Sequence, residues 1–331
     1  MSSQNAISRF SLIARDSKDH LASFAEAVEA GLQGRPKSIP CRFLYDEEGS
    51  QLFEQICEVP EYYLTRAERS ILEKRATEIA ACFDGPLTLA ELGSGNAAKT
   101  RLLIEACLHA HGRLRYVPVD ISPEILESSS LALLDDYPAL EVRAIATEYR
   151  ASLPHVRADT EYPKLIAWLG SSIGNLTRDE AAAFLHSVRG NMSREDRVLL
   201  GIDLRKSPRE LEAAYDDAAG VTSRFSLNLL QRLNRELDAN FDIGAFRHSA
   251  VYCEAEGRVH IEIVSRRAQR VRIDALDMEV EFAADEGIHT ENAFKYSAEE
   301  IERLAAAADL ELDRGWSDVH ERFSLNLLAP A

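Results

Sequence analysis

The chain has 331 residues, of which 46% are hydrophobic and 28% charged, a composition typical of a globular protein. A formal net charge of −17 argues against nucleic-acid binding, which needs clustered Lys and Arg side chains. No apolar stretch approaches the ~20 residues of a membrane helix and the N-terminus lacks the apolar part of a secretory signal, so we expect a cytoplasmic protein without membrane contact.

The first part of the chain is predicted to be helical. Residues 17–33 carry apolar side chains at helical spacing, and a segment with one glycine and two prolines, residues 34–40, ends this helix. A turn and a short helix follow within residues 43–56. Residues 66–81 form the next helix, which leads into the first strand.

Strands and helices then alternate over about 100 residues. We predict strands at 87–92, 115–120, 140–145 and 165–169, and helices at 97–110 and 123–134. A helix at 178–189 and a strand at 198–203 continue the series. This alternation indicates a parallel sheet with helices on both faces.

Glycines and acids follow the predicted strand ends. The first strand ends in Gly93-Ser-Gly95 and the second ends in Asp120. A glycine turn before a helix brings backbone N–H groups against a ligand, and an acid at the next strand end binds ribose hydroxyls. The third glycine of the dinucleotide fingerprint is missing and Glu91 precedes the turn, so the pattern fits S-adenosylmethionine better than NAD.

After Lys206 the pattern changes. Residues 208–237 are predicted to be mostly helical, and residues 247–282 alternate apolar and polar side chains as antiparallel strands do. We expect an insertion with its own small sheet, then a connection over residues 287–296. A helix at 298–307 and a strand near 322–328 end the chain.

One heptapeptide occurs twice. Arg224-Phe-Ser-Leu-Asn-Leu-Leu230 recurs letter for letter at residues 322–328. We predict a helix for the first copy and a strand for the second, and attribute the repeat to chance.

Metal and serine-hydrolase chemistry are not indicated. The nine histidines include no pair at metal-binding helical spacing, and the five scattered cysteines include no C-x-x-C pair. We therefore expect no metal and reduced thiols. The segment Gly170-Ser-Ser-Ile-Gly174 does not have the pattern of a nucleophile elbow.

Several longer blocks resemble one family. They include Phe43-Leu-Tyr-Asp46, Pro60-Glu-Tyr-Tyr63, Glu91-Leu-Gly-Ser-Gly95, Lys99-Thr-Arg-Leu-Leu103, Leu169-Gly-Ser-Ser-Ile-Gly-Asn-Leu176, Ala214-Tyr-Asp-Asp-Ala-Ala-Gly-Val-Thr222 and Thr290-Glu291. Over about residues 35–331 the chain resembles the histidine Nα-methyltransferases, the hercynine-forming enzymes of the ergothioneine pathway.

The resemblance implies an α/β fold with a Rossmann-like class I methyltransferase core and a doubly wound sheet. The core would comprise residues 67–205 and 295–331 and bind S-adenosylmethionine. A second, α+β substrate-binding domain would comprise residues 1–66 and the insertion at 206–294. We expect a monomer whose partner is a small amino acid.

The resemblance also implies roles for individual residues. The cofactor would be bound by Tyr45, Gly93, Lys99, Asp120, Glu148 and Tyr149. The amino and carboxylate groups of the amino acid would be held by Tyr62, Gly170, Asn175 and Tyr215, of which Tyr62, Asn175 and Tyr215 would orient the reacting nitrogen. The rest of the substrate would lie against Phe53, Thr222, Ile261, Glu291 and Ala293, with Glu291 receiving the imidazole.

Four residues depart from the family pattern, two of them adjacent. The family usually has Asp-Phe where Glu148-Tyr149 stands, Met where Ile261 stands and Ser where Ala293 stands. Two of these departures fall in the side-chain pocket. The alternatives are therefore the same reaction on another aromatic amino acid, such as tryptophan or a histidine derivative, or a non-catalytic S-adenosylmethionine-binding module.

Overall fold

The computed structural model describes residues 9–14, 17–159 and 161–331, which form two compact units. The core unit comprises residues 64–204 and 296–331 together with the strand Phe10–Ala14. The second unit comprises residues 17–63 and 205–295. Each unit has a sheet of its own.

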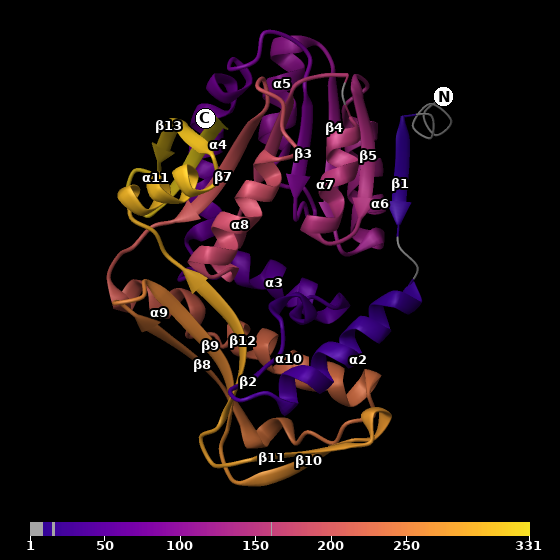
Figure 1. Cartoon of the computed structure of the whole chain (residues 1–331), viewed down its shortest axis with the longest axis vertical. Coiled ribbons are helices and arrows are strands. Elements are labelled where there is room, and N and C mark those ends of the chain that lie inside the picture. Colours follow the sequence, from indigo (N-terminus) through magenta and orange to yellow (C-terminus); the bar gives the residue numbers. More distant parts are fainter. Residues whose placement is uncertain (1–8, 15–16, 160) are drawn as a thin grey trace. The chain divides into compact units, whose positions relative to one another are not determined.

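The core unit is built on an eight-stranded sheet in the order β1-β5-β4-β3-β6-β7-β14-β13 (Figure 1). The first six strands pair in parallel, whereas β14 pairs antiparallel with β7 and with β13. The strands are β1 (Phe10–Ala14), β3 (Thr88–Leu92), β4 (Leu114–Asp120), β5 (Leu140–Ala146), β6 (Lys164–Trp168), β7 (Arg197–Asp203), β13 (Leu310–Ser317) and β14 (Phe323–Pro330).

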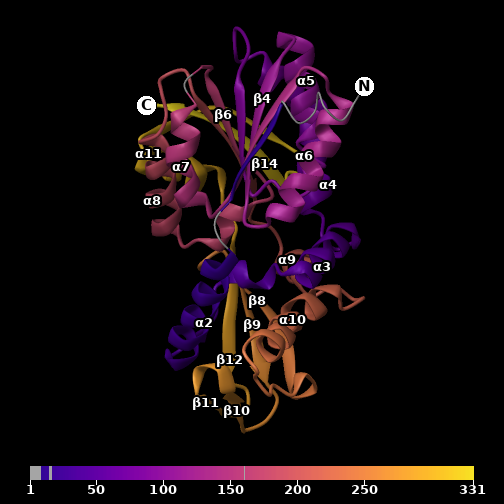
Figure 2. The ribbon, with the colours of Figure 1, turned by 90° about the vertical axis from the view of Figure 1, so that its right-hand side faces the viewer.

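Helices cover both faces of this sheet. Figure 2 shows α4, α5 and α6 on one face and α7, α8 and α11 on the other. Their bounds are α4 (Leu64–Ala80), α5 (Arg101–His111), α6 (Pro123–Asp136), α7 (Tyr149–Ala158), α8 (Arg178–Arg189) and α11 (Ala298–Ala307), and the short η2 (Ser172–Asn175) follows β6. The strands β3, β4 and β6 are completely or almost completely buried, as expected for a parallel sheet covered on both faces. This is the Rossmann-like, doubly wound α/β fold that the alternation of strands and helices predicts.

Side-chain caps determine where two of these helices begin. Thr177 before α8 and Ser297 before α11 each accept a hydrogen bond from the backbone of Glu180 or Glu300, whose side chains bond back to the cap. These capping boxes satisfy backbone N–H groups that the first helical turn leaves without partners. Both helices have the bounds that the sequence predicts.

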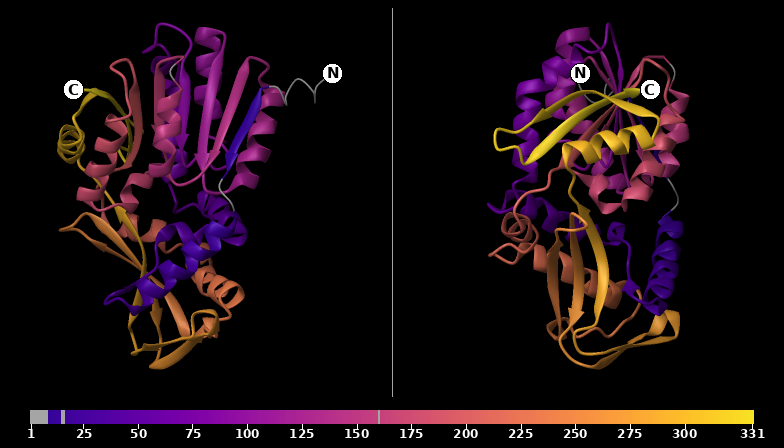
Figure 3. Two further views of the ribbon diagram at one scale, coloured as in Figure 1. Left: turned by 45° about the vertical axis from the view of Figure 1, so that its right-hand side comes forward. Right: turned by 60° about the vertical axis from the view of Figure 1, so that its left-hand side comes forward.

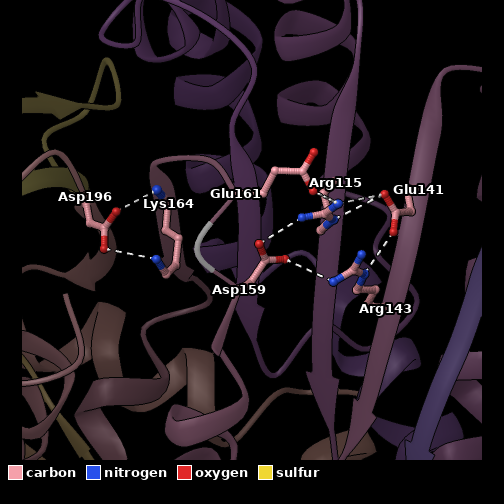
Figure 4. Close-up of polar contacts among 7 residues, drawn as sticks. All are labelled: Arg115, Glu141, Arg143, Asp159, Glu161, Lys164 and Asp196. Carbon is pink, nitrogen blue, oxygen red and sulfur yellow. Dashed lines mark hydrogen bonds and ion pairs between the residues drawn. The ribbon is translucent and has the colours of Figure 1, made fainter. Parts of the chain in front are cut away.

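Ion pairs hold the amino ends of the parallel strands (Figure 4). Arg115 at the start of β4 contacts Glu141, Asp159 and Glu161. Lys164 at the start of β6 contacts Asp196, with 3.4 Å between Nζ and Oδ2. The cations Arg115 and Lys164 and the acids Asp159 and Asp196 are all buried, so these charges neutralise one another inside the protein.

The second unit combines helices with a four-stranded sheet in the order β2-β12-β9-β8. A separate antiparallel pair, β10 and β11, extends from it (Figure 3). The strands are β2 (Lys37–Ser38), β8 (Phe246–Cys253), β9 (Arg258–Ser265), β10 (Gln269–Ile273), β11 (Met278–Phe282) and β12 (Gly287–Phe294). The helices are α2 (Ser17–Gln33), α3 (Glu47–Glu58), α9 (Pro208–Tyr215) and α10 (Val221–Glu236), with short turns η1 (Cys41–Leu44), η3 (Ile243–Ala245) and η4 (Asp274–Leu276).

Several segments differ from the sequence predictions. Residues 287–296, expected as a connection, contain β12, which pairs with β9 and β2. The strands β1, β2 and β13 and the helix α7 were not expected. Residues 1–66 were assigned as a whole to the second domain, but β1 pairs with β5 because Phe10 and Leu12 pack on the apolar cluster that contains Leu126. Residues 1–8 lie outside the described part of the chain.

Within the described residues, no helix is both long and apolar enough to cross a membrane. The five cysteines, all of them among the described residues, form no disulfide.

Candidate active site

The glycine turn between β3 and α5 is closed tightly against β4. The N–H groups of Gly93 and Ser94 both donate to the carbonyl of Val119, at 2.8 and 3.1 Å. Gly93 has a φ of +75°, and a Cβ atom there would lie 2.8 Å from the hydroxyl of Tyr149. Only glycine fits this backbone and this close approach, so the turn brings Gly93 and Tyr149 together.

Asp120, at the end of β4, is bonded to backbone N–H groups on two sides. Its Oδ2 accepts from Gly95 at 3.0 Å and its Oδ1 accepts from Ser122 at 3.1 Å. Burial raises the pKa of Asp120, while these N–H groups act in the opposite direction. In the described part of the chain no Lys, Arg or His forms an ion pair with Asp120. The carboxylate therefore lies at the strand end beside the glycine turn, and no cation among the described residues neutralises it.

Glu91, just before the turn, has a different role. Thr100 donates to its Oε1 at 2.6 Å, and the hydroxyl of Tyr116 donates to its Oε2. Burial raises the pKa of Glu91 to about 7, against the effect of these two hydrogen bonds. Because its partners come from the start of α5 and from β4, Glu91 ties three elements together beneath the turn.

Lys99 and Gly170, predicted to bind the cofactor and the substrate, meet at one carboxylate. The ammonium of Lys99 forms an ion pair with Glu68, and the N–H of Gly170 donates to both Glu68 oxygens at 2.8 and 3.0 Å. Asn175 ends η2, five residues after Gly170. Within the core unit, Lys99 is thus linked to the loop that carries both substrate candidates.

Glu148 and Tyr149 lie at the start of α7, just beyond the end of β5. Glu148 is the exposed N-cap residue of this helix. The ring of Tyr149 packs against Trp168 and Phe184, with ring centroids 5.8 and 6.3 Å apart. Tyr149 is therefore fixed by aromatic packing while its hydroxyl faces Gly93.

The second unit contains an aromatic cluster made largely of predicted site residues. Tyr45 contacts Phe53 at 5.4 Å between ring centroids, Phe53 contacts Tyr62 at 6.3 Å, and Tyr62 contacts Tyr215 at 6.1 Å. Phe225 of α10 packs against both Tyr45 and Phe53. Tyr45, a cofactor candidate, lies in this unit, whereas the other cofactor candidates belong to the core unit.

Tyr215 has partners at its hydroxyl and at its backbone. Lys295 is buried, and its ammonium donates to the Tyr215 hydroxyl at 2.7 Å. The Tyr215 carbonyl lies 2.8 Å from Nε2 of His248, whose Nδ1 lies 2.9 Å from the Ser226 hydroxyl. Because an ammonium can only donate, the Tyr215 oxygen accepts this bond, and its own proton is directed to another acceptor.

Glu291, Ile261 and Ala293 lie on two adjacent strands. Glu291 of β12 is the cross-strand partner of Ile261 on β9, directly after an irregularity at Thr290. Glu291 and Ala293 are two residues apart in β12, so their side chains point to the same face. Burial raises the pKa of Glu291 to about 7, and the charge of Lys295 acts in the opposite direction.

Thr222 is the remaining substrate candidate. Its N–H donates to Asp217 Oδ1 at 2.7 Å, and the N–H of Val221 donates to Oδ2 at 2.9 Å. Asp217 thereby caps the N-terminus of α10, where Thr222 lies.

Three residues of these networks were not predicted. Phe225 belongs to the repeated heptapeptide, whose apolar side chains indicate ordinary core residues of a helix. Glu68 and Lys295 are charged residues in a helix and after a strand, and their local sequence gives no sign of burial. Among the described residues, no group of three or more His, Cys, Asp or Glu side chains could hold a metal ion.

Comparison with known proteins identifies the family. Residues 24–330 match the family described as histidine-specific, SAM-dependent methyltransferases. The chain belongs to this family. It is therefore an S-adenosylmethionine-dependent methyltransferase, and its core unit has the fold expected of a class I enzyme.

Individual relatives in the family differ in their substrates. The chain is 42% identical to the histidine N-alpha-methyltransferase of Mycolicibacterium smegmatis, over 91% of this chain and 92% of that protein. It is 41% identical to the enzyme of the same name from Mycobacterium tuberculosis, over 94% of this chain and 95% of that protein. The 4-dimethylallyltryptophan N-methyltransferase of Arthroderma benhamiae is 26% identical over 89% of this chain and 90% of that protein.

The core unit of this methyltransferase suits the cofactor of its family. Gly93 provides the positive-φ turn between β3 and α5, where backbone N–H groups can approach a ligand. Asp120 offers carboxylate oxygens at the strand end, the position at which nucleotide-binding sheets bind ribose hydroxyls. The glycine turn after β3 and the carboxylate at the end of β4 therefore both agree with S-adenosylmethionine.

Proposed function

We propose that this methyltransferase transfers methyl groups from S-adenosylmethionine to the α-amino nitrogen of L-histidine, forming N,N,N-trimethylhistidine (hercynine). The main support is the identity of 42% to a histidine N-alpha-methyltransferase, which extends over 91% of the chain and therefore over residues of both units. Identity to the tryptophan-directed relative is 26%, so that alternative substrate is less well supported. Membership of an enzyme family disfavours a non-catalytic binding module.

We assign cofactor binding in the core unit to Gly93, Lys99, Asp120 and the Glu148–Tyr149 pair. Asp120 accepts the ribose hydroxyls, and the Lys99 ammonium attracts the carboxylate of the cofactor's methionine part. The exposed Glu148 accepts from the adenine amine beside Tyr149. In the second unit, Tyr45 is the one residue assigned to the cofactor.

The α-amino and carboxylate groups of histidine are assigned to Gly170 and Asn175 of the core unit and to Tyr62 and Tyr215 of the second unit. The hydrogen bond from Lys295 supports the role of Tyr215, because it fixes the position of a hydroxyl that keeps its own proton as a donor. Tyr62, Asn175 and Tyr215 orient the reacting nitrogen.

The imidazole is assigned to Glu291, with Phe53, Thr222, Ile261 and Ala293 around it. A carboxylate on the same face as Ala293 can accept the imidazole N–H. Because alanine offers no hydroxyl to the other ring nitrogen, this chain contributes one polar contact fewer than the usual serine of the family. Ile261, the cross-strand partner of Glu291, gives this position an apolar wall.

The chemistry requires a neutral amine aligned with an activated methyl group. The cofactor supplies that methyl group on a sulfonium, so the protein's contribution is to bind, orient and exclude competing geometries. The amine must lose its proton before each transfer, and we assign no side chain as an obligatory base. The linked rings of Tyr45, Phe53, Tyr62 and Tyr215 provide π faces that favour the cationic trimethylammonium product.

A panel assay tests this function. The chain is incubated with S-adenosylmethionine and single amino acids, among them histidine, tryptophan and methylated histidines, and S-adenosylhomocysteine is quantified. Histidine is expected to give the fastest release, and Glu291→Ala is expected to abolish nearly all of it. If Glu291→Ala retains histidine turnover, the imidazole assignment is wrong. If tryptophan exceeds histidine, the proposed substrate is wrong.

A further inference from the structure

Glu68, on helix α4 of the core unit, is a completely buried acid that the sequence analysis did not single out. Glutamate is rarely buried unless it is paired, because removing an ionised carboxylate from water is costly. The surroundings of Glu68 therefore have to compensate for its burial.

The cost of burying the Glu68 carboxylate is offset by two residues, one assigned to the cofactor and one to the amino-acid substrate. The Lys99 ammonium forms an ion pair with one Glu68 oxygen, and the N–H of Gly170 donates to both oxygens at 2.8 and 3.0 Å. A Cβ atom on Gly170 would lie 3.7 Å from the Lys99 Nζ, so the ammonium is next to the Gly170 backbone. One carboxylate thus contacts a cofactor candidate and a substrate candidate at the same time.

The fourth member of this arrangement is Gly201 in the middle of β7. A Cβ atom on Gly201 would lie 2.2 Å from Oε1 of Glu68. The carboxylate occupies the space that a side chain at Gly201 would need. The loop 170–175 is also attached to β7, because the N–H of Asp203 donates to the hydroxyl of Ser171 at 3.0 Å.

We propose that Glu68 is a positioning residue for methyl transfer, which fixes the Lys99 ammonium and the loop 170–175 in one arrangement. This inference deepens the proposed function, since it takes Lys99 as a cofactor residue and Gly170 and Asn175 as substrate residues. Loss of the Glu68 charge leaves the Lys99 ammonium without this partner, so its flexible side chain samples other positions. The N–H of Gly170 then also loses its charged acceptor. Affinity for the cofactor and the KM for histidine should therefore change together.

Two variants perturb the carboxylate in different ways. Glu68→Gln keeps the size of the side chain and one acceptor oxygen but removes the charge. Gly201→Ala keeps all charges, while its new methyl group displaces the carboxylate, which is the movable end of a side chain. The ring atoms of Phe323, 3.3 Å from the new Cβ position, need to yield only slightly. Glu73→Gln is the matched control, because Glu73 is an exposed acid on the same helix.

The measurements are the calorimetric Kd for S-adenosylmethionine, the KM for histidine at saturating cofactor, and the Tm of each protein. Glu68→Gln and Gly201→Ala are each expected to raise both constants by roughly tenfold or more, the range for a hydrogen bond to a charged group. Glu73→Gln should leave both constants unchanged.

A double-mutant cycle separates positioning from general destabilisation. If Glu68 acts through Lys99, Glu68→Gln has little further effect on the cofactor Kd once Lys99→Met is present. Full additivity of the two substitutions, with native-like Tm values, would overturn the proposal.

The remaining outcomes are also decisive. An unchanged cofactor Kd in folded Glu68→Gln contradicts the proposal. If that variant does not fold, Gly201→Ala decides, and an unchanged Kd there has the same meaning. If the wild-type chain releases no S-adenosylhomocysteine with histidine, the proposed function fails, whereas the cofactor Kd values still test the role of Glu68.

Discussion

The two ends of the parallel strands in the core unit hold acids in opposite ways. Asp196, near the amino ends, accepts from the backbone of Lys164 and Ser193 at 2.8 and 2.7 Å and also contacts the Lys164 ammonium (Figure 4). Asp120, at the carboxyl end of β4, is held by backbone N–H groups, and the described residues supply it with no ion pair. A charge that the protein neutralises stabilises the fold, whereas a charge that N–H groups merely orient can serve a ligand.

Substitution of Asp196 is expected to have the largest effect among the changes that test this difference between the two acids. Asp196→Ala removes a fully buried acid and leaves the buried Lys164 ammonium without its partner. Breaking a buried pair in this way costs about 3–5 kcal/mol in the free energy of unfolding. Denaturant titration measures this loss. The adjacent, exposed Glu195→Ala is the control and should lose almost nothing. A large loss of cofactor affinity in folded Asp196→Ala would contradict the contrast.

Asp120→Ala should have the opposite profile. Loss of hydrogen bonds to an ionised group is expected to weaken S-adenosylmethionine binding by about 1.5–3 kcal/mol, while stability falls less than in Asp196→Ala. Calorimetry with the cofactor measures the effect, and Glu127→Ala, an exposed acid on α6, is the control. Unchanged cofactor affinity would rule out the ribose assignment.

Glu291 is an acid of the second unit that is also assigned to a ligand, and its raised pKa predicts that histidine affinity depends on pH. Burial raises its pKa from the ordinary value of 4.5 to about 7, so this group lowers the stability of the ligand-free fold as the pH rises from about 4.5 to about 7. The imidazole N–H binds the ionised carboxylate more strongly than the neutral acid. Histidine affinity should therefore increase by up to about tenfold between about pH 6 and about pH 8, since one pKa unit corresponds to about 1.4 kcal/mol.

Calorimetry with histidine at both pH values measures this dependence. Glu291→Gln keeps an acceptor oxygen but cannot titrate, so it should retain only the pH dependence of histidine itself. Identical pH profiles for wild type and Glu291→Gln would show that Glu291 does not receive the imidazole.

The smallest effect is expected at Ala293. A serine here restores a hydroxyl on the face that carries Glu291, and a neutral hydrogen bond contributes about 0.5–1.5 kcal/mol. Ala293→Ser should therefore lower the KM for histidine roughly two- to twelvefold in steady-state assays. Ala293→Val, which fills the space without a polar group, is the matched comparison and should not lower it. An unchanged KM in Ala293→Ser would mean that water already occupies the position.

The repeated heptapeptide shows what the sequence could predict. Residues 224–230 lie within α10, and nearly all of the second copy lies within β14, as the flanking patterns indicated. The same seven residues adopt both structures because neighbouring segments and tertiary packing, not local propensity, decide between them. Longer periodic segments, such as α2 and α8, were predicted with the bounds that the structure has.

The elements and site residues that could not be predicted depend on contacts between residues distant in sequence. The strand β12 was expected to be a connection because its apolar and polar residues do not alternate cleanly, and its register shifts between His289 and Glu291. The strand β13 is exposed at nearly every residue, so it has no buried face to detect. Glu68 and Lys295 are buried only because Gly170, Lys99 and Tyr215, all distant in sequence, meet them in the fold.

The positions that follow strand ends were the most predictable part of the site. Gly93, Asp120 and Gly170 could be placed at one edge because parallel strands direct their carboxyl ends to the same side of a sheet. The roles of Tyr62, Tyr215 and Glu291 came from the resemblance to a family, because no local pattern distinguishes a site tyrosine or glutamate from a structural one.

The most direct test of the account is the identity of the product made from histidine. The chain is incubated with S-adenosylmethionine and histidine labelled with nitrogen-15 at the α-amino group, and the product is analysed by tandem mass spectrometry. The account predicts three methyl groups on the labelled nitrogen and one S-adenosylhomocysteine for each. Methyl groups on the imidazole, or no methylated histidine while another amino acid is methylated, would contradict it.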